Sequence, residues 1–301
     1  MINLPVVRQI LLREQVDICH GHMGTSMISL STNLVAKLVG VRTVYTEHSL
    51  FQFNDAAGIH LNKLVKWFMC ELDAAIGVSH ICKDTMVLRA KIKPQDCFVI
   101  PNAVDSNKFY PLSWEDECKK DLDTITIVYV SRLEYRKGAD FLVDIIPAML
   151  EKYPTQLKFL IGGGGSKMAV IKNMVEKREL TDKVTLLGAI LPNNVRNTLV
   201  QGDIFLNTSL TESFCIANLE AGCSGCLVVS TSVGGVPEVL PPHMTYLAET
   251  TTESIMEQLE VAMERVIEEK RRMKESEKYR RRKYDEKIAN YNRIKDIYNW
   301  Q

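Results

Sequence analysis

The sequence predicts an α/β protein built from two Rossmann-like domains, followed by a charged helical tail. Three observations indicate this class: a length of 301 residues, an alternation of short apolar runs with amphipathic segments, and one polar stretch that interrupts the alternation. A domain usually contains about 100–200 residues, so this length favours two domains. Apolar runs that alternate with helical segments are typical of parallel sheets covered by helices on both faces.

The first domain is predicted to span residues 1–104 and to contain about four strands. Its apolar runs lie at residues 16–20, 42–46, 74–79 and 97–102. The intervening segment 60–72 has the apolar spacing of a helix. Because the second domain has five or six such runs, we expect the amino-terminal domain to be truncated.

A second series of apolar runs follows a polar linker, residues 105–123, which has no clear periodicity. The runs predicted as strands lie at residues 124–130, 157–162, 183–188, 203–208 and 226–231. They place the second Rossmann-like domain at residues 124–250. The tail, residues 251–301, begins with an apolar stripe of helical spacing formed by Ile255, Leu259, Met263 and Val266.

Composition and charge exclude several classes of function. Lys and Arg together number 37, as do Asp and Glu, so no overall positive charge recruits nucleic acid. No apolar run reaches the roughly 18 residues of a membrane-spanning helix. The eight cysteines lack the spacing of a disulfide scaffold, and Cys223 and Cys226 are better explained as small buried thiols than as a metal or redox site.

The tail carries a concentration of basic residues. From Lys270 to Lys283 the sequence contains nine Lys or Arg residues against Glu275 and Glu277. A solvated helix with many salt bridges is the first interpretation of this pattern. Binding to an anionic membrane surface is the functional alternative.

The residues that follow the predicted strands include several groups that can bind ligands. In open parallel sheets ligands bind beyond the carboxyl ends of the strands, so these positions are the first candidates for a site. Arg132 and Lys137 lie in the loop after residues 124–130, where two cations near a helix N-terminus suit a diphosphate. His48 follows the run at residues 42–46 and is a candidate for a substrate contact.

The glycine run Gly162–Gly165 has neither the spacing of a dinucleotide-binding fingerprint nor that of a P-loop. It still allows the backbone at Gly163 and Gly164 to approach a ligand closely. Asp121 and Asp123 resemble a metal-binding D-x-D element, but they precede their strand instead of following it. We therefore assign them to the linker.

Glu212 and Glu220 lie eight residues apart, the first just before and the second near the end of a helix predicted from about Phe214 to Ala221. This spacing does not bring the two carboxylates together as a close catalytic pair. Glu212 can equally stabilise the helix dipole. The spacing alone does not decide between ligand contacts and solvated charges.

Three motifs resemble the signature of the retaining glycosyltransferases of family 4, which have the two-domain GT-B fold. They are "SRLEYRKG", "SLTESFCIANLEA" with its two glutamates, and "STSVGGVPEVL". The longer stretches "TEHSLF", "VIPNAVD" and "VSRLEYRKGAD" resemble the family of phosphatidylinositol N-acetylglucosaminyltransferase catalytic subunits. The resemblance implies transfer of GlcNAc from UDP-GlcNAc to phosphatidylinositol, the first step of GPI-anchor biosynthesis.

The resemblance also implies roles for the residues that match in position. Arg132 and Lys137 would bind the donor diphosphate and stabilise the leaving UDP. Gly163 and Gly164 would pass near the nucleotide. The family needs no metal and no cofactor besides its donor substrate, in agreement with the assignment of the two aspartates to the linker.

Three further side chains receive roles in the same way. Glu212 would face the transferred sugar, His48 would lie near the reacting sugar, and Glu220 would hold the ribose hydroxyls. The expected partners are a UDP-sugar, phosphatidylinositol and the other subunits of a membrane-bound transferase complex, without nucleic acid. The implied location is the cytoplasmic face of the endoplasmic reticulum membrane.

Two alternatives stay open for the chain. A family 4 transferase with another donor or acceptor would use the same residues, and a scaffold subunit without activity would fit an incomplete amino-terminal domain. An oxidoreductase is a third option, which the absence of G-x-G-x-x-G after any apolar run disfavours.

Overall fold

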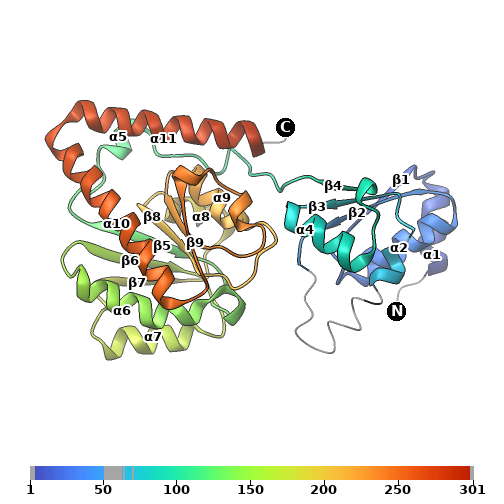
Figure 1. Ribbon diagram of the computed structural model, residues 1–301, viewed down its shortest axis with the longest axis horizontal. Helices are drawn as coiled ribbons and strands as arrows, with labels where there is room; N and C mark the ends of the chain where they lie inside the picture. The colour runs from blue at the N-terminus through green and yellow to red at the C-terminus, as the bar shows by residue number, and fades with distance from the viewer. Residues whose placement is uncertain (1–3, 51–62, 64, 70, 299–301) are drawn as a thin grey trace. The chain divides into compact units, whose positions relative to one another are not determined.

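The computed structural model describes residues 4–50, 63, 65–69 and 71–298, and the chain divides into two compact units. The first unit comprises residues 1–102 together with 212–214, and the second comprises residues 103–211 together with 215–301. Each unit contains one parallel sheet with helices packed on it (Figure 1). The predicted α/β class with two Rossmann-like domains is therefore confirmed.

The first unit contains a four-stranded parallel sheet in the order β1-β2-β3-β4. The strands are β1 (Ile18–His22), β2 (Arg42–Glu47), β3 (Ala74–Gly77) and β4 (Cys97–Val99). Each falls within or beside one of the four apolar runs, so this part of the prediction is confirmed. The predicted helix at 60–72 lies partly outside the described residues.

Helices described in the first unit include α1 (Leu4–Arg13), α2 (Met27–Leu38) and α4 (His80–Thr85), which a π-helical turn, Met86–Ala90, continues. Side-chain caps explain where two of them begin. The hydroxyl of Ser26 accepts from the Ser29 N–H at α2, and that of Ser79 accepts from the Cys82 N–H at α4. Both caps satisfy backbone donors that have no partner within the helix.

The second unit contains a six-stranded parallel sheet in the order β10-β9-β8-β5-β6-β7. The strands are β5 (Ile125–Val130), β6 (Leu157–Gly162), β7 (Val184–Gly188), β8 (Ile204–Asn207), β9 (Leu227–Thr231) and β10 (Thr245–Ala248). The first five were predicted. No strand was predicted at β10, an edge strand in which three of four residues are half-buried.

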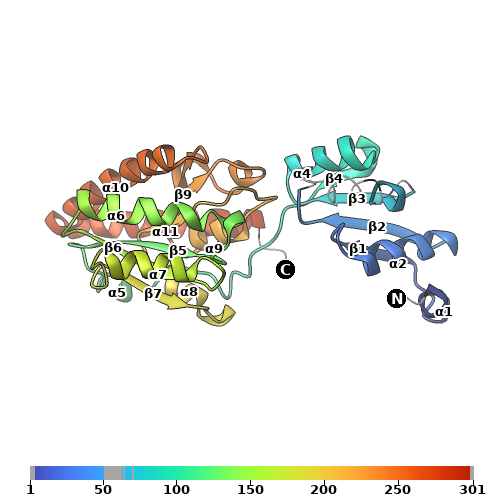
Figure 2. The same ribbon diagram turned by 90° about the horizontal axis from the view of Figure 1, so that it is seen from below.

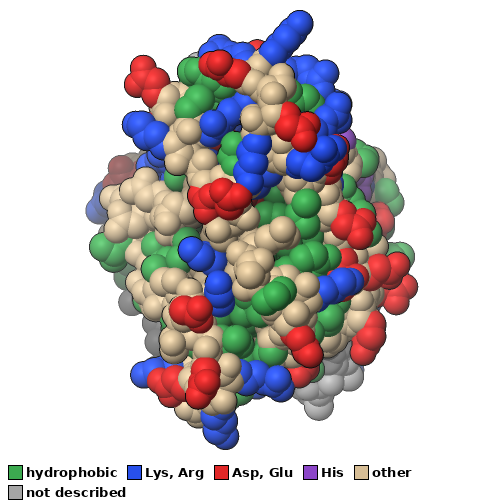
Figure 3. Space-filling view, turned by 90° about the vertical axis from the view of Figure 1, so that its left-hand side faces the viewer, with side chains coloured by type: hydrophobic (Ala, Val, Ile, Leu, Met, Phe, Trp, Pro, Cys, Tyr) green, Lys and Arg blue, Asp and Glu red, His purple; other side chains and the backbone are tan. Residues whose placement is uncertain are grey.

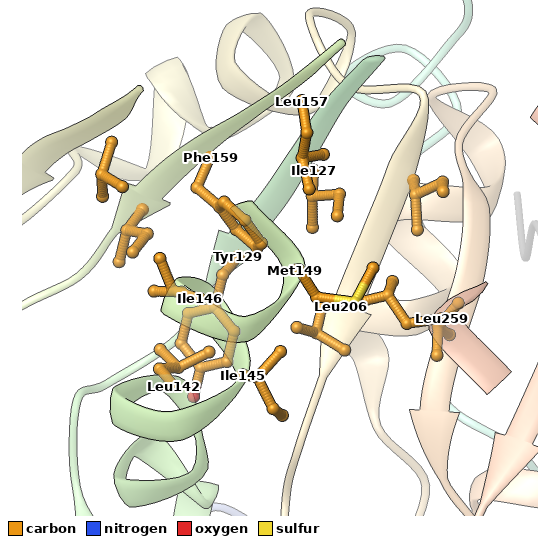
Figure 4. Packing of buried hydrophobic residues seen from close by; sticks show 14 of the residues in the cluster. Ile127, Tyr129, Leu142, Ile145, Ile146, Met149, Leu157, Phe159, Leu206 and Leu259 are labelled. Carbon is orange, nitrogen blue, oxygen red and sulfur yellow. The ribbon is translucent and has the colours of Figure 1, made fainter. Parts of the chain in front are cut away.

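One face of this sheet is covered by α6 (Leu142–Lys152), α7 (Met168–Lys177) and α10 (Thr252–Glu275). Figure 2 shows α6 and α7 in front of the strands, and Figure 4 shows Tyr129 and Phe159 of the sheet packed against Ile146 of α6. The apolar stripe at the start of the tail belongs to the same core, because all four of its side chains are buried. The predicted helical stripe is therefore confirmed.

The opposite face carries α8 (Val195–Leu199) and α9 (Ile216–Cys223), and α11 (Glu277–Tyr298) packs on α9. The predicted linker contains a short helix, α5 (Trp114–Glu117). Cys223 and Cys226 are buried and reduced, and burial raises the pKa of both thiols to about 12. Such thiols stay protonated at neutral pH, which agrees with their interpretation as structural residues.

The basic residues of the tail are less solvated than the sequence suggests. Lys270 is buried, and its ammonium donates to the carbonyls of Asp121 and Thr124 and forms an ion pair with Asp203. Arg280 donates to the carbonyls of Glu117 and Cys118. Other Lys and Arg side chains lie on the surface, where Figure 3 shows cationic side chains mixed with Asp and Glu, and some form ion pairs, such as Arg271 with Glu268 and Arg281 with Asp285. Part of the basic run therefore holds the tail against the rest of the second unit.

None of the helices in the described part of the chain is both long enough and apolar enough to span a membrane.

Candidate functional site

Three loops meet at the carboxyl edge of the second sheet. They follow β5, β6 and β8, and we call them the β5 loop (131–138), the β6 loop (163–167) and the β8 loop (208–211). The β5 loop contacts the β6 loop through the Leu133 N–H, which donates to the Gly164 carbonyl over 2.9 Å. It contacts the β8 loop through the Leu210 N–H, which donates to the Arg136 carbonyl over 3.0 Å. The loops therefore form one hydrogen-bonded structure.

Glycines allow these loop backbones to approach so closely. Gly138 has a φ of +64°, and a Cβ on it would lie 1.8 Å from the carbonyl oxygen of Thr208. Gly163 has a φ of +136°, and a Cβ there would lie 1.7 Å from the carbonyl oxygen of Ser131. Both positions combine a backbone conformation that disfavours side chains with a neighbour that leaves no room for one. The two glycines thus fix how the loops nest.

Side chains add further bonds between the same loops. The hydroxyl of Thr208 contacts the carbonyls of Lys137 and Gly138 at 3.0 and 2.9 Å. The carboxylate of Glu134 accepts from both the N–H and the hydroxyl of Ser166. These bonds lower the pKa of Glu134, so it stays ionised. The β5 loop is therefore held on both of its sides.

The predicted cations Arg132 and Lys137 lie on the β5 loop, with the Arg132 side chain exposed and the Lys137 side chain half-buried. The Lys137 backbone is fixed, because its carbonyl accepts from the hydroxyls of Tyr129 and Thr208. Gly163 and Gly164 lie on the adjoining β6 loop. The structure thus brings these four predicted residues onto two hydrogen-bonded loops at one sheet edge.

Glu220 lies on α9 (Ile216–Cys223), which follows the β8 loop in the chain. Residue 215, a cysteine, has a φ of +69° and precedes the first helical residue, Ile216. The helix therefore runs from Ile216 to Cys223, two residues later than predicted. Burial raises the pKa of Glu220 to about 7, so its carboxylate is only partly ionised at neutral pH.

Glu212 lies four residues before α9 and is half-buried. It belongs to the first unit, whereas Glu220, Arg132 and Lys137 belong to the second. The two glutamates of the motif therefore fall in different units.

His48 follows β2 in the first unit and is half-buried. Its imidazole Nε2 lies 3.0 Å from Nδ1 of His22, at the end of β1. The ring of His22 stacks on that of His20, with centroids 4.4 Å apart. Each of these histidines alone is weak evidence of function, but the structure joins all three. The contact between the strands was not foreseen, although the positions at two strand ends were the available signal.

Glu47, which precedes His48, is a buried carboxylate that the sequence analysis did not single out as a site residue. It is fully buried and accepts hydrogen bonds from the backbone of Gly24, His48 and Ser49 and from the hydroxyls of Tyr45 and Ser49. These donors come from the β1–α2 loop, from β2 and from the residues after β2. The carboxylate therefore fixes the backbone that carries His48.

No group of three or more His, Cys, Asp or Glu side chains within the described residues is arranged to hold a metal ion. Asp121 and Asp123 have other contacts, since Asp121 accepts from the Asp123 N–H and Asp123 pairs with Lys274.

Comparison with known proteins identifies relatives for both units. Residues 113–284 match the family model of glycosyl transferases group 1, and residues 1–55 match the model of PIGA (GPI anchor biosynthesis). A phosphatidylinositol N-acetylglucosaminyltransferase subunit of Arabidopsis thaliana is 46% identical over 87% of this chain and 57% of the relative. The Homo sapiens protein of the same name is 47% identical over 87% of this chain and 53% of the relative. The chain thus spans just over half the length of these relatives.

Solved structures of low sequence identity share the fold. Anabaena HepE in complex with UDP superposes with a TM-score of 0.75 at 16% identity, over 98% of this chain and 78% of that one. Sucrose-phosphate synthase from Thermosynechococcus elongatus gives a TM-score of 0.74 at 19% identity, over 99% of this chain and 73% of that one. These likenesses support the predicted GT-B fold.

Nesting of the loops predicts different costs for two glycine substitutions. Gly138 and Gly188 have φ values of +64° and +69°, but a Cβ at Gly188 has no atom within 4 Å. Gly188→Ala should cost about 1–2 kcal/mol of unfolding free energy, the cost of the backbone conformation alone. Gly138→Ala should cost at least about 2 kcal/mol more, because its Cβ collides with the Thr208 backbone. Urea denaturation measures both, and equal losses would contradict the nesting.

Burial of Glu220 predicts that this carboxylate destabilises the free protein at alkaline pH. Its folded pKa of about 7 lies above the ordinary value of 4.5. The cost of ionising it in the folded state therefore grows as the pH rises through this interval and is complete above pH 7. At pH 8, Glu220→Gln should raise the unfolding free energy by about 1–3 kcal/mol. The exposed control Glu257→Gln should change it by less than about 0.5 kcal/mol. Denaturation at pH 5 and pH 8 checks this, and a gain independent of pH would refute it.

Proposed function

The chain belongs to the glycosyl transferases group 1 family, and from this premise we propose that it transfers GlcNAc from UDP-GlcNAc to phosphatidylinositol. This is the first step of GPI-anchor biosynthesis. The single observation that carries the proposal is the nested β5 and β6 loops, which hold Arg132 and Lys137 in the part of the chain that matches the family model. Relatives named for this activity, 46% and 47% identical over 87% of the chain, support the choice of donor and acceptor.

The β5 loop supplies the charge that such a transfer needs. When the bond between the sugar and UDP breaks, negative charge grows on the diphosphate, and groups placed there beforehand stabilise the transition state. In this proposal the guanidinium of Arg132 donates hydrogen bonds to phosphate oxygens. Lys137, whose backbone is fixed by Thr208, adds a positive charge. These side-chain cations take the place of a divalent metal, so the proposed reaction is metal-independent.

Other side chains receive the remaining roles. Glu220 holds the ribose hydroxyls, and the backbone at Gly163 and Gly164 passes beside the nucleotide. Glu212 and His48 contact the transferred sugar. The acceptor hydroxyl oxygen forms the new bond to the anomeric carbon on the face that UDP leaves, and the acceptor proton passes to the departing phosphate. This course retains the anomeric configuration.

We propose phosphatidylinositol and the other subunits of a transferase complex as partners, at the cytoplasmic face of the endoplasmic reticulum membrane. The names of the relatives support this, because each is called a subunit of the transferase. The exposed cations Arg281 and Arg282 of α11 are a candidate contact with anionic lipid. Arg280 is excluded from that role because it holds two backbone carbonyls.

Titration calorimetry with UDP-GlcNAc tests the donor site. Arg132→Ala and Lys137→Ala should each weaken binding at least about 10-fold, because each removes a charge-assisted contact with the diphosphate. Lys172→Ala, on the exposed surface of α7, removes the same charge elsewhere and should leave binding unchanged. Binding that is indifferent to Arg132 and Lys137 would overturn the assignment.

Transfer of radiolabelled GlcNAc to phosphatidylinositol, measured on the assembled complex, tests the activity itself. The proposal predicts labelled glycolipid with the unaltered chain and loss of about 100-fold or more with Arg132→Ala. A complex that requires the chain for assembly but makes no labelled product would favour the scaffold alternative.

A further inference from the structure

Three imidazoles lie together at the carboxyl edge of the first sheet. His20 and His22 are two residues apart on β1, so they project from the same face of the strand. Gly21 between them faces α2, where a Cβ would lie 2.4 Å from the Ser29 hydroxyl. The parallel register pairs His22 with Thr46, two residues before His48. Strand pairing therefore places the His22 side chain beside His48.

The ring of His48 is held by two hydrogen bonds. Its Nε2 lies 3.0 Å from His22 Nδ1, and the Asn102 side chain also bonds to the ring. The Asn102 contact favours the charged form of His48. In a neutral pair one of the two facing nitrogens donates and the other accepts, so the contact links the tautomers of the two rings. The partner on β1 thus restricts the tautomer and the orientation of His48.

The surroundings oppose positive charge on His20 and His48. Burial lowers the pKa of His48, and the neighbouring His22 lowers it further. Burial is also the largest cause that lowers the pKa of His20, followed by His22 and His48. The ring centroids of His22 and His48 lie 5.3 Å apart, a distance at which two like charges repel. Glu47 opposes this repulsion. Its carboxylate accepts from the backbone N–H of His48, and its negative charge raises the pKa of the His48 ring. The thiol of Cys82, from α4, faces the Glu47 backbone.

We propose that His22, on which the His20 ring stacks, is a positioning residue for His48, and that the two imidazoles are coupled in charge, so that His22 opposes a positive charge on His48. The functional part of this inference rests on the proposed function, in which His48 contacts the transferred sugar. His22 then keeps the His48 ring neutral and correctly turned toward that sugar. The coupling itself is a property of the first unit and does not depend on any activity.

Imidazole nitrogen NMR across pH 4–9 on the full chain tests the coupling. His22→Asn keeps an amide where Nδ1 stood but removes the like charge, so the pKa of His48 should rise by on the order of 0.5 unit. His80→Asn, at the start of α4, removes a histidine elsewhere in the unit and should leave His48 unchanged. An identical His48 titration in the unaltered chain and in His22→Asn would overturn the proposal. His22→Gln serves as a second variant should His22→Asn not fold.

Transfer kinetics test the positioning. His22→Leu should lower kcat about 10-fold or more with little change in KM for UDP-GlcNAc, because a misplaced ring affects the reaction more than donor binding. His22→Asn should recover most of that loss, and a loss that His22→Asn does not recover would reject the positioning role. An inactive unaltered chain would count against the proposed function, whereas the NMR titration would still decide the coupling.

Discussion

The close approach of loop backbones at the carboxyl edge of the second sheet is the constraint on which the candidate site depends. A carbonyl lies where a Cβ would stand at both Gly138 and Gly163, so the loops can pack in this way only if these residues lack side chains. The packing aligns backbone donors with carbonyls and fixes the chain at Lys137. The flexible side chains of Arg132 and Lys137 thus extend from a rigid base, which limits the entropy lost on binding an anion.

In the first unit a different interaction fixes the segments that carry the polar side chains. There the strand ends are held by the buried carboxylate of Glu47, which accepts from β2 and from the segments that follow β1 and β2. A buried charge is stable only when it is fully hydrogen-bonded, so this arrangement tolerates little change around it. His48 follows Glu47 directly, and its backbone N–H is held by the Glu47 carboxylate. Each unit therefore presents its polar groups from a carboxyl strand edge, one through steric fit and the other through hydrogen bonds.

The sequence was most informative where one strand or helix determines the outcome. The apolar composition of runs such as residues 125–130 predicts a buried strand. Since the strands are parallel, the polar residues that follow them lie at one edge of the sheet. It failed at β10, whose residues are mostly half-buried, and at the start of α9, where Cys215 takes a left-handed conformation that its residue type does not predict. The bond between His22 and His48 joins distant segments, and no local pattern encodes it.

The central claim is that the nested β5, β6 and β8 loops form the site for a nucleotide-sugar. Hydrogen exchange followed by mass spectrometry, with and without UDP-GlcNAc, tests it most directly. The account predicts slower exchange on binding in peptides that cover residues 131–138, 163–167 and 208–211, because a bound ligand stabilises the loops against local opening. Protection confined to the opposite end of the sheet, around Lys120 and Asp203, would contradict it, as would saturating ligand that protects none of the three loops.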